Sequence, residues 1–420
     1  MARRTEEHPM PDSNDPKGEA QPEGARPPQP PLRPRALPAS AATPLVTPIF
    51  PSVVYRSVDA DEMDAQYEGR LPGYTYSREG HVNATVLARR LAAMEGVPEA
   101  AGPGVVTGSG MGAVAAVLLG LLQAGDHVVA SDQLYGRTLR LMARELPRLG
   151  IATSLVDATD AAAVAAAMRP ETRMVLVEVV SNPTIRVADM PGIVAAARAA
   201  GAVLVVDNTF TTPFGYAPLA EGAQVVLHSV TKLLAGHSDA MLGWVGTDTP
   251  ERAQAVREAA ETWGFTGSPF DCWLAERGLA SFPLRHARAS ANAAVLADRL
   301  AAEPSVEAVL YPGRPEHPDH NRVARVLGET HGTMLSFRMR GGRAEVNRFL
   351  RAAEALPFAP TLGDVATTLS HPASSSHRAL DEAARAALGI TEGFIRVSVG
   401  VEEPQAVGDA LIGALREATA

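Results

Sequence analysis

The chain is poor in cysteine, and this scarcity excludes two kinds of structure. Its 420 residues include one cysteine, Cys272. The chain therefore forms no internal disulfide and no metal site built from several thiolates, and we expect no metal. Cys272 stands in the apolar stretch SPFDCWL, which favours a buried, inert thiol over a reactive one.

Lysine is nearly absent as well. Of the 38 basic residues, only Lys17 and Lys232 are lysines, and all the others are arginines. An arginine stays protonated and is not a useful amine, whereas a lysine can condense with an aldehyde. A composition that avoids lysine this strongly indicates a specific chemical use for the one that it keeps inside the main body of the chain.

A basic balance and long apolar runs are missing too. The formal net charge of −9 argues against a general nucleic-acid or anionic-membrane binder. No apolar run reaches the roughly 20 residues that a membrane span requires. Residues 1–42 are rich in Pro, Glu, Gly and Arg and contain no secretory h-region, so we expect a disordered tail on a cytoplasmic protein.

The rest of the chain alternates between strand and helix patterns, which predicts an α/β fold with a mostly parallel central sheet. We expect a large domain at 101–290, a smaller C-terminal α/β domain at 291–420, and an N-terminal segment at 43–100. Helices are predicted at 136–150, 190–201, 284–304 and 344–355, and one more is predicted to begin near Met111. The predicted strands are HVVAS (127–131), RMVLVEVV (173–180), AVLVVDN (202–208), QVVLHS (224–229), MLGWVG (241–246), VEAVLYPG (306–313), THGTMLSFRMRG (330–341) and FIRVSVG (394–400).

The strongest chemical signal is the pair of segments DNTFTTP and HSVTKLLAGHSD. Asp207 ends one predicted strand and Lys232 follows the next one, and ligands bind outside the carboxyl ends of strands in such sheets. A lysine that holds a cofactor aldehyde and a carboxylate that keeps a pyridine nitrogen protonated are complementary. The hydroxyls of Ser229 and Thr231 can bind a phosphate. Alone, Asp207 fits a turn or helix cap equally well.

Two weaker signals point the same way. GSGMGAV places a glycine-rich turn before a helix, where free N–H groups bind phosphate, although such turns are often only structural. The segment is neither a dinucleotide fingerprint nor a P-loop. Tyr135, in DQLYGRT, can stack on an aromatic cofactor and move a proton, although a lone loop tyrosine is more often structural.

Together these motifs resemble the Cys/Met-metabolism family of pyridoxal-phosphate enzymes, which includes cystathionine γ-synthase, cystathionine γ-lyase and methionine γ-lyase. HSVTKLLAGHSD resembles the family signature S-x-T-K-x-x-x-G-H-x-D, and SNPTIRVADMP, GYTYSREG, TLGDVATTLSHPASSSH and ITEGFIRVSVGVEE resemble further family segments. The likeness covers about residues 43–418. It implies the fold-type-I architecture, pyridoxal 5'-phosphate as cofactor, an amino-acid substrate, and a homo-oligomer, a tetramer of two dimers.

The resemblance also implies residue roles. Lys232 would hold the cofactor and move protons, Asp207 would pair with the pyridine nitrogen, and Asn182 would contact the cofactor hydroxyl. The phosphate would be bound by Gly110, Met111, Ser229 and Thr231, with Tyr76 and Arg78 from a neighbouring subunit. Tyr135 would stack on the ring and protonate the leaving group, while Arg396 and Thr361 would bind the substrate.

The substrate end departs from the family pattern. Arg137 stands where methionine γ-lyases carry cysteine and several relatives carry glycine, and it either faces solvent or reads an anionic group. We expect γ-elimination or γ-replacement on a sulfur-type or O-activated homoserine-type amino acid. The alternatives are methionine γ-lyase or β-lyase activity, a specialised-metabolism γ-substitution enzyme, a fold-type-I aminotransferase, or a non-catalytic cofactor-binding regulator.

Overall fold

The computed structural model describes residues 40–378 and 380–420. The chain divides into two units, Met1–Val46 and Thr47–Ala420. The described residues of the first unit, 40–46, contain bends and neither helix nor strand. Most of the tail expected at 1–42 lies outside the described residues. Everything that follows concerns the second unit.

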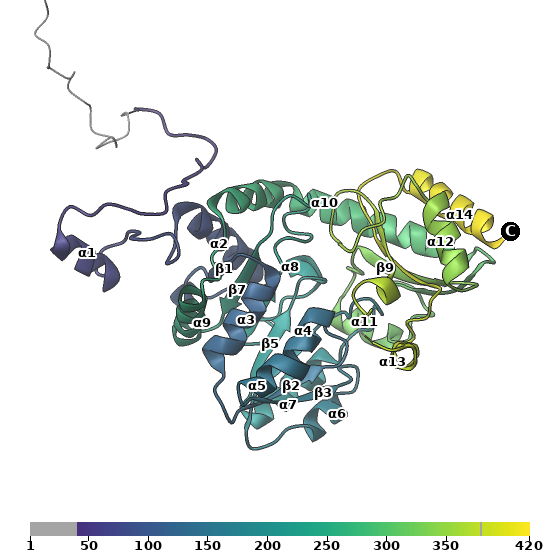
Figure 1. Ribbon diagram of the computed structural model, residues 1–420, viewed down its shortest axis with the longest axis horizontal. Coiled ribbons are helices and arrows are strands. Elements are labelled where there is room, and N and C mark those ends of the chain that lie inside the picture. Colours follow the sequence, from purple (N-terminus) through teal and green to yellow (C-terminus); the bar gives the residue numbers. More distant parts are fainter. Residues whose placement is uncertain (1–39, 379) are drawn as a thin grey trace, which may run out of the picture. The chain divides into compact units, whose positions relative to one another are not determined.

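The larger sheet has seven strands in the order β1-β7-β6-β5-β4-β2-β3 (Figure 1). The five strands β2 to β6 are parallel, while β7 runs antiparallel to both β6 and β1. This confirms the mostly parallel sheet that the sequence predicts. The strands are Val105–Thr107 (β1), His127–Ser131 (β2), Ala152–Val156 (β3), Thr172–Glu178 (β4), Val203–Asp207 (β5), Val225–His228 (β6) and Gly243–Thr247 (β7).

Both faces of this sheet are covered, because successive strand residues point to opposite sides. In β5, Val205 packs into one hydrophobic core, and Leu204 and Val206 pack into the other. The first core lies under α3 (Gly110–Leu121) and α9 (Pro250–Trp263). The second lies under α2 (Val82–Glu95), α7 (Met190–Ala200) and the first half of α10 (Pro269–Ala301). The continuous apolar runs of the strands follow from this two-sided burial.

The smaller sheet is antiparallel and has the order β10-β11-β9-β8. Its strands are Val306–Leu310 (β8), Met334–Met339 (β9), Thr368–Ser370 (β10) and Phe394–Ser398 (β11). The second half of α10, α12 (Arg343–Ala352) and α14 (Pro404–Thr419) share one hydrophobic core with it. The remaining helical segments are Ala60–Tyr67 (α1), Glu99–Ala101 (η1), Gly136–Arg140 (α4), Leu141–Glu145 (η2), Leu146–Arg148 (α5), Ala161–Ala166 (α6), Thr212–Gly215 (α8), His320–Val326 (α11), Pro372–Ser374 (η3) and Glu382–Ala387 (α13).

The predicted strands are all present, with ends shifted by a few residues. The prediction for α10 was wrong at its start: the helix begins at Pro269 rather than at 284 and contains Pro283 in its interior. A proline within a helix removes one backbone hydrogen bond, and apolar residues of α10 on both sides of Pro283 are buried and so keep the helix continuous. The predicted domain boundary at 290 falls within α10.

Candidate active site

The carboxyl ends of four adjacent strands bring the chemical groups together. Lys232 follows β6, Asp207 ends β5, Glu178 ends β4, and Tyr135 lies in the loop after β2. Strands β6, β5, β4 and β2 are parallel neighbours, so their carboxyl ends meet at one edge of the sheet. Asp207 and Lys232 therefore follow adjacent strands at the same edge of the sheet, as the sequence predicts.

Lys232 faces the segment that follows α12. Its Nζ donates to the Thr361 hydroxyl at 3.4 Å. Gly363 makes this approach possible: its φ is +81°, and a Cβ there would lie 2.4 Å from the Leu233 nitrogen and 2.8 Å from the Lys232 carbonyl carbon. Burial, and then the positive charge of Arg396, lowers the pKa of Lys232. A larger share of this amine is therefore unprotonated and nucleophilic than in an exposed lysine.

A buried carboxyl group, Glu178, and a partly buried one, Asp207, lie side by side at the strand ends, and the sequence predicts only Asp207. Glu178 and Asp207 are paired in the β4–β5 register. Burial, and then the charge of Asp207, raises the pKa of Glu178 well above its ordinary value. Burial also raises the pKa of Asp207, but Thr209 and the His228 charge oppose this, and the Thr209 N–H donates to Asp207 at 3.0 Å. Like charges this close disfavour ionisation. The Asp207 charge raises the pKa of Glu178, whereas Thr209 and His228 favour the ionised form of Asp207.

Glu178 also binds the backbone of the loop that carries Tyr135. The Tyr135 N–H donates to Glu178 Oε1 at 2.7 Å, and the Asn182 N–H bonds to the same carboxyl group. The Tyr135 side chain remains 41% exposed. In the sequence, Glu178 is a single acidic residue inside the apolar run RMVLVEVV, and this pattern alone does not show that the residue belongs to the site.

Arg396 is a buried cation at the junction of the two sheets. It lies on β11 with 5% exposure. Its Nη1 donates to Asn182 Oδ1 at 2.8 Å, and its Nη2 donates to the Thr361 carbonyl oxygen at 2.5 Å. Its Nε has no partner among the described residues. Burial lowers the pKa of Arg396 to about 10, so the guanidinium remains charged near neutral pH and keeps an N–H free for an anionic ligand.

The start of α3 forms a cradle for an anion. Ser109 caps the helix by accepting from the Gly112 N–H at 3.0 Å, while the N–H groups of Gly110 and Met111 have no acceptor among the described residues. A Cβ on Gly110 would lie 2.5 Å from the Cβ of Ser229. Free N–H groups and the Ser229 hydroxyl therefore converge at a helix N-terminus, the arrangement that binds phosphate.

Thr231 is held differently from Ser229. Its hydroxyl donates to the Leu242 carbonyl oxygen at 3.1 Å and accepts from the Leu242 N–H at 2.9 Å. A hydroxyl oxygen has two lone pairs and one proton, and this bond uses the proton within the protein. A phosphate contact from Thr231 therefore stays a prediction.

Three predicted residues are not joined to Lys232 by any described contact. Tyr76 and Arg78 lie on a hairpin-like segment in which Tyr76 bridges Val54. The Arg78 guanidinium lies over the Tyr76 ring, 5.2 Å from its centroid, and pairs with Glu79 at 3.7 Å. Arg137 lies in α4, and its exposed side chain has no hydrogen bond or ion pair among the described residues.

Two further sequence expectations concern the body of the protein. Cys272 is fully buried, and burial raises the pKa of its thiol to about 12, which agrees with the expected inert thiol. Within the described ranges, no helix is both long and apolar enough to cross a membrane.

Comparison with known proteins identifies the family. A family described as Cys/Met metabolism PLP-dependent enzyme matches residues 36–416. The chain belongs to this family. Its members include an O-succinylhomoserine sulfhydrylase from Pseudomonas aeruginosa, 38% identical over 84% of this chain and 85% of that protein. A cystathionine γ-lyase from Bacillus subtilis is 37% identical over 80% of this chain and 87% of that protein.

A solved structure extends the likeness to the fold. The cystathionine γ-synthase from Xanthomonas oryzae superposes with a TM-score of 0.83 at 36% identity, covering 89% of this chain and 94% of that one. The protein is therefore a pyridoxal-phosphate-dependent enzyme of the fold-type-I class, and its cofactor is pyridoxal 5'-phosphate. The expected family, fold class and cofactor are confirmed.

We expect Gly110→Ala to weaken cofactor binding, because the new methyl group would collide with Ser229. Losing one charge-assisted hydrogen bond to the phosphate costs about 1.5–3 kcal/mol, or tenfold or more in the cofactor dissociation constant. The matched control is Gly112→Ala, two residues along the same helix, where a Cβ would meet its neighbours at an ordinary 3.4 Å. Fluorescence titration of the apoenzyme measures both constants. Equal cofactor affinities for the two variants would show that the start of α3 does not bind the cofactor phosphate.

Proposed function

We propose that this enzyme catalyses γ-elimination or γ-replacement on an amino acid that carries a sulfur or activated oxygen substituent at its γ-carbon. The observation that carries this proposal is the pairing of a depressed-pKa amine, Lys232, with a buried guanidinium, Arg396, across Thr361. One group can take a proton from an α-carbon while the other holds the neighbouring carboxylate. The named relatives catalyse reactions of this class.

The residues fit the cofactor of the family. Gly110, Met111 and Ser229 would hold its phosphate, Asp207 would pair with the ring nitrogen, and Lys232 would hold its aldehyde carbon. When bound, the cofactor supplies an electron-withdrawing ring that stabilises negative charge on the substrate carbons. The Asp207 charge raises the pKa of Glu178, and Thr209 and His228 favour the ionised form of Asp207, which supports the role of Asp207.

The other residues would act on the substrate. The Arg396 Nε, which has no described partner, suits an incoming α-carboxylate, because a guanidinium binds carboxylates through a planar fork. The Lys232 amine would remove the α-proton and return protons at later carbons. The exposed phenol of Tyr135 would meet the leaving group. Asn182 would contact the cofactor hydroxyl while it orients Arg396.

A fold-type-I aminotransferase would share the sheet, the lysine and the aspartate. It would need an oxo-acid partner and would release no ammonia, so product analysis separates the two. The relatives include a sulfhydrylase, γ-lyases and cystathionine β-lyases, and these similarities favour no single leaving group.

The decisive experiment offers the purified holoenzyme O-acyl homoserines, cystathionine, methionine and a sulfonium amino acid, with and without an added thiol. We expect at least one γ-substituted compound to give a 2-oxo acid with ammonia, or a new thioether when the thiol is present. Lys232→Ala should abolish either product, and borohydride reduction of the wild type should leave the pyridoxyl group on Lys232. Mass spectrometry reads both. Transamination alone, or a pyridoxyl group on another residue, would contradict the proposal.

We also propose a homo-oligomer, a tetramer of two dimers, in which Tyr76 and Arg78 complete a neighbour's phosphate site. The arm that carries them exposes a set of large apolar side chains: Ile49, Val53, Val54, Val58, Met63, Tyr67 and Leu71. Exposed apolar surface of this kind is typical of a protein interface. The Arg78 side chain lies over Tyr76, pairs with Glu79 and acts electrostatically on Glu261. The Arg78 carbonyl oxygen accepts from the Thr266 hydroxyl.

Subunit mixing tests the shared site. Arg78→Ala and Lys232→Ala homo-oligomers should each be nearly inactive, and co-refolded mixtures should regain part of the activity, because some hybrid sites combine an intact Arg78 with an intact Lys232. Arg70→Ala, which changes an exposed arginine of the same arm that pairs with Glu68, serves as the control and should remain active by itself. Absence of recovery despite proven subunit exchange would show that each chain builds its site alone.

Arg137 has either a solvent-facing or a substrate-reading role, and its exposure without a partner leaves its five donors available. If it reads an anionic group on a substrate or leaving group, Arg137→Gly should reduce kcat/KM for a carboxylate- or phosphate-bearing substrate by about 1.5–3 kcal/mol. Neutral substrates should change far less. Equal losses on one anionic and one neutral substrate would assign Arg137 a structural role only.

A further inference from the structure

The loop of residues 181–187, which we call the Asn182 loop, is closed on itself. The Ser181 N–H donates to the Arg186 carbonyl oxygen at 2.9 Å, the Ile185 N–H donates to the Ser181 carbonyl oxygen at 3.0 Å, and Val180 bridges Val187. Ile185 has a φ of 57°, which is uncommon for a β-branched residue. Such a conformation persists only where the surroundings impose it, so contacts from outside determine the shape of this loop.

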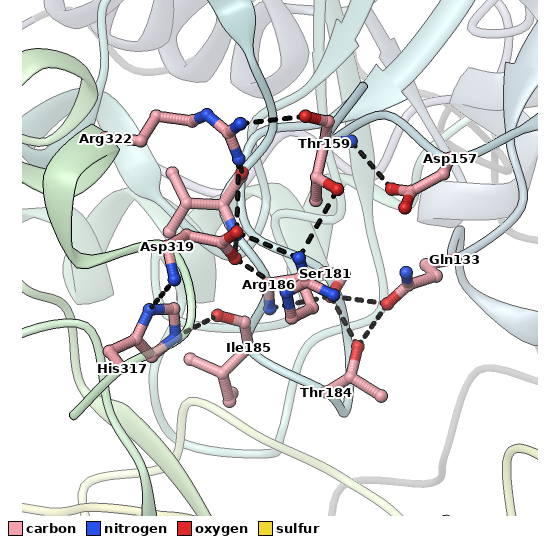
Figure 2. A network of polar contacts seen from close by, with 11 residues as sticks. Gln133, Asp157, Thr159, Ser181, Thr184, Ile185, Arg186, His317, Asp319 and Arg322 are labelled. Atoms are coloured by element: carbon pink, nitrogen blue, oxygen red, sulfur yellow. Dashed lines mark hydrogen bonds and ion pairs between the residues drawn. The ribbon is translucent and has the colours of Figure 1, made fainter. Parts of the chain in front are cut away.

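The main outside contact comes from Asp319, just before α11 (Figure 2). Its carboxylate accepts from Arg186 Nε at 2.7 Å, from Arg186 Nη2 at 2.9 Å and from the Val187 N–H at 2.9 Å. Burial by itself raises the pKa of Asp319, but the hydrogen bonds of Arg186 and Val187 outweigh it and leave the pKa below its ordinary value. The ionised carboxylate therefore makes three hydrogen bonds to the base of the loop.

Arg322 and His317 add further hydrogen bonds to Asp319 and to the loop. Arg322 Nη1 donates to Asp319 at 3.1 Å and to the Val187 carbonyl oxygen at 2.9 Å. His317 bonds to the Ile185 carbonyl oxygen at 2.9 Å and accepts from the Asp319 N–H at 3.1 Å. Figure 2 shows these side chains surrounding the loop base from one side. All of them belong to the connection between β8 and β9, more than a hundred residues away in the sequence.

The tip of the same loop meets Arg396. Asn182 Oδ1 accepts from Arg396 Nη1 at 2.8 Å, and the next residue, Pro183, accepts through its carbonyl oxygen from the Ser336 hydroxyl at 2.7 Å. Ser336 and Arg396 are paired across β9 and β11. Two consecutive loop residues therefore bind two paired residues of the smaller sheet, and the direction of the Arg396 guanidinium depends on the position of the loop.

We propose that Asp319 is a positioning residue, which fixes the Asn182 loop through Arg186 and thereby aims Arg396 at the α-carboxylate of the substrate. This inference rests on the carboxylate-binding role given to Arg396 under the proposed function. It adds a residue remote from the reacting atoms, whose removal disturbs recognition of one substrate group and leaves the amine chemistry intact.

The test compares two ligands of the holoenzyme that differ only in the carboxylate: norvaline, and butylamine, which is norvaline without that group. The change in cofactor absorbance gives both dissociation constants. Asp319→Asn keeps the shape of the side chain but loses the charge that pairs with Arg186. We expect it to raise the dissociation constant of norvaline about tenfold and to leave that of butylamine unchanged. Arg186→Lys keeps the charge but cannot fork onto a carboxylate, so it should reproduce the same selective loss.

Two controls separate the possible failures. Asp248→Asn breaks an ion pair of the same 2.7 Å length with Arg252 and should affect neither ligand. Arg396→Ala should weaken norvaline alone. If Arg396→Ala is not selective, Arg396 does not bind the α-carboxylate, and the positioning role proposed for Asp319 is contradicted as well. If Arg396→Ala is selective but Asp319→Asn and Arg186→Lys weaken both ligands equally, or neither, only the positioning role is overturned.

Discussion

The charge of Arg396 is buried where the two sheets meet, and much of the site depends on how this burial is compensated. A buried guanidinium is costly unless its donors are bonded. Asn182 and the Thr361 carbonyl oxygen satisfy two of them, and each partner comes from a loop that also belongs to the site. Thr361 accepts from Lys232, and Asn182 bonds to Glu178. One cation therefore links the loops that carry Thr361 and Asn182, the two segments that also contact Lys232 and Glu178.

The pairing of Glu178 with Asp207 shows how environment divides two similar residues. Both are carboxyl groups at the ends of adjacent strands. Glu178 accepts backbone N–H groups from two loops that face the site, whereas Asp207 accepts from Thr209 and lies near His228. The surroundings of Glu178 therefore raise its pKa well above the ordinary value, while Thr209 and His228 favour the ionised form of Asp207, which is the form that the proposed pairing with the ring nitrogen needs.

The sequence predicts the parts of the site that depend on strand ends. Lys232 and Asp207 follow apolar runs, and parallel strands bring such positions together. The strand-end rule does not identify Glu178, because this residue lies inside a predicted strand and nothing in the neighbouring sequence distinguishes a buried glutamate from an exposed one. The rule does not identify Asp319 either, for another reason: its partner Arg186 is 133 residues away, and no periodicity encodes that contact. The start of α10 was wrong because Pro283 looks like a helix boundary when tertiary packing is not considered.

The same helix has a mechanical consequence. The first half of α10 packs in the core of the larger sheet and the second half in that of the smaller sheet (Figure 1), so the two halves of the protein are connected by a stiff rod rather than by a loop. A rod transmits rotation instead of absorbing it. Pro283, which lacks one hydrogen bond of the helical ladder, lies between the two packed stretches. The place of the smaller sheet, and of the guanidinium that it carries, is therefore held by side-chain packing along both halves of one helix.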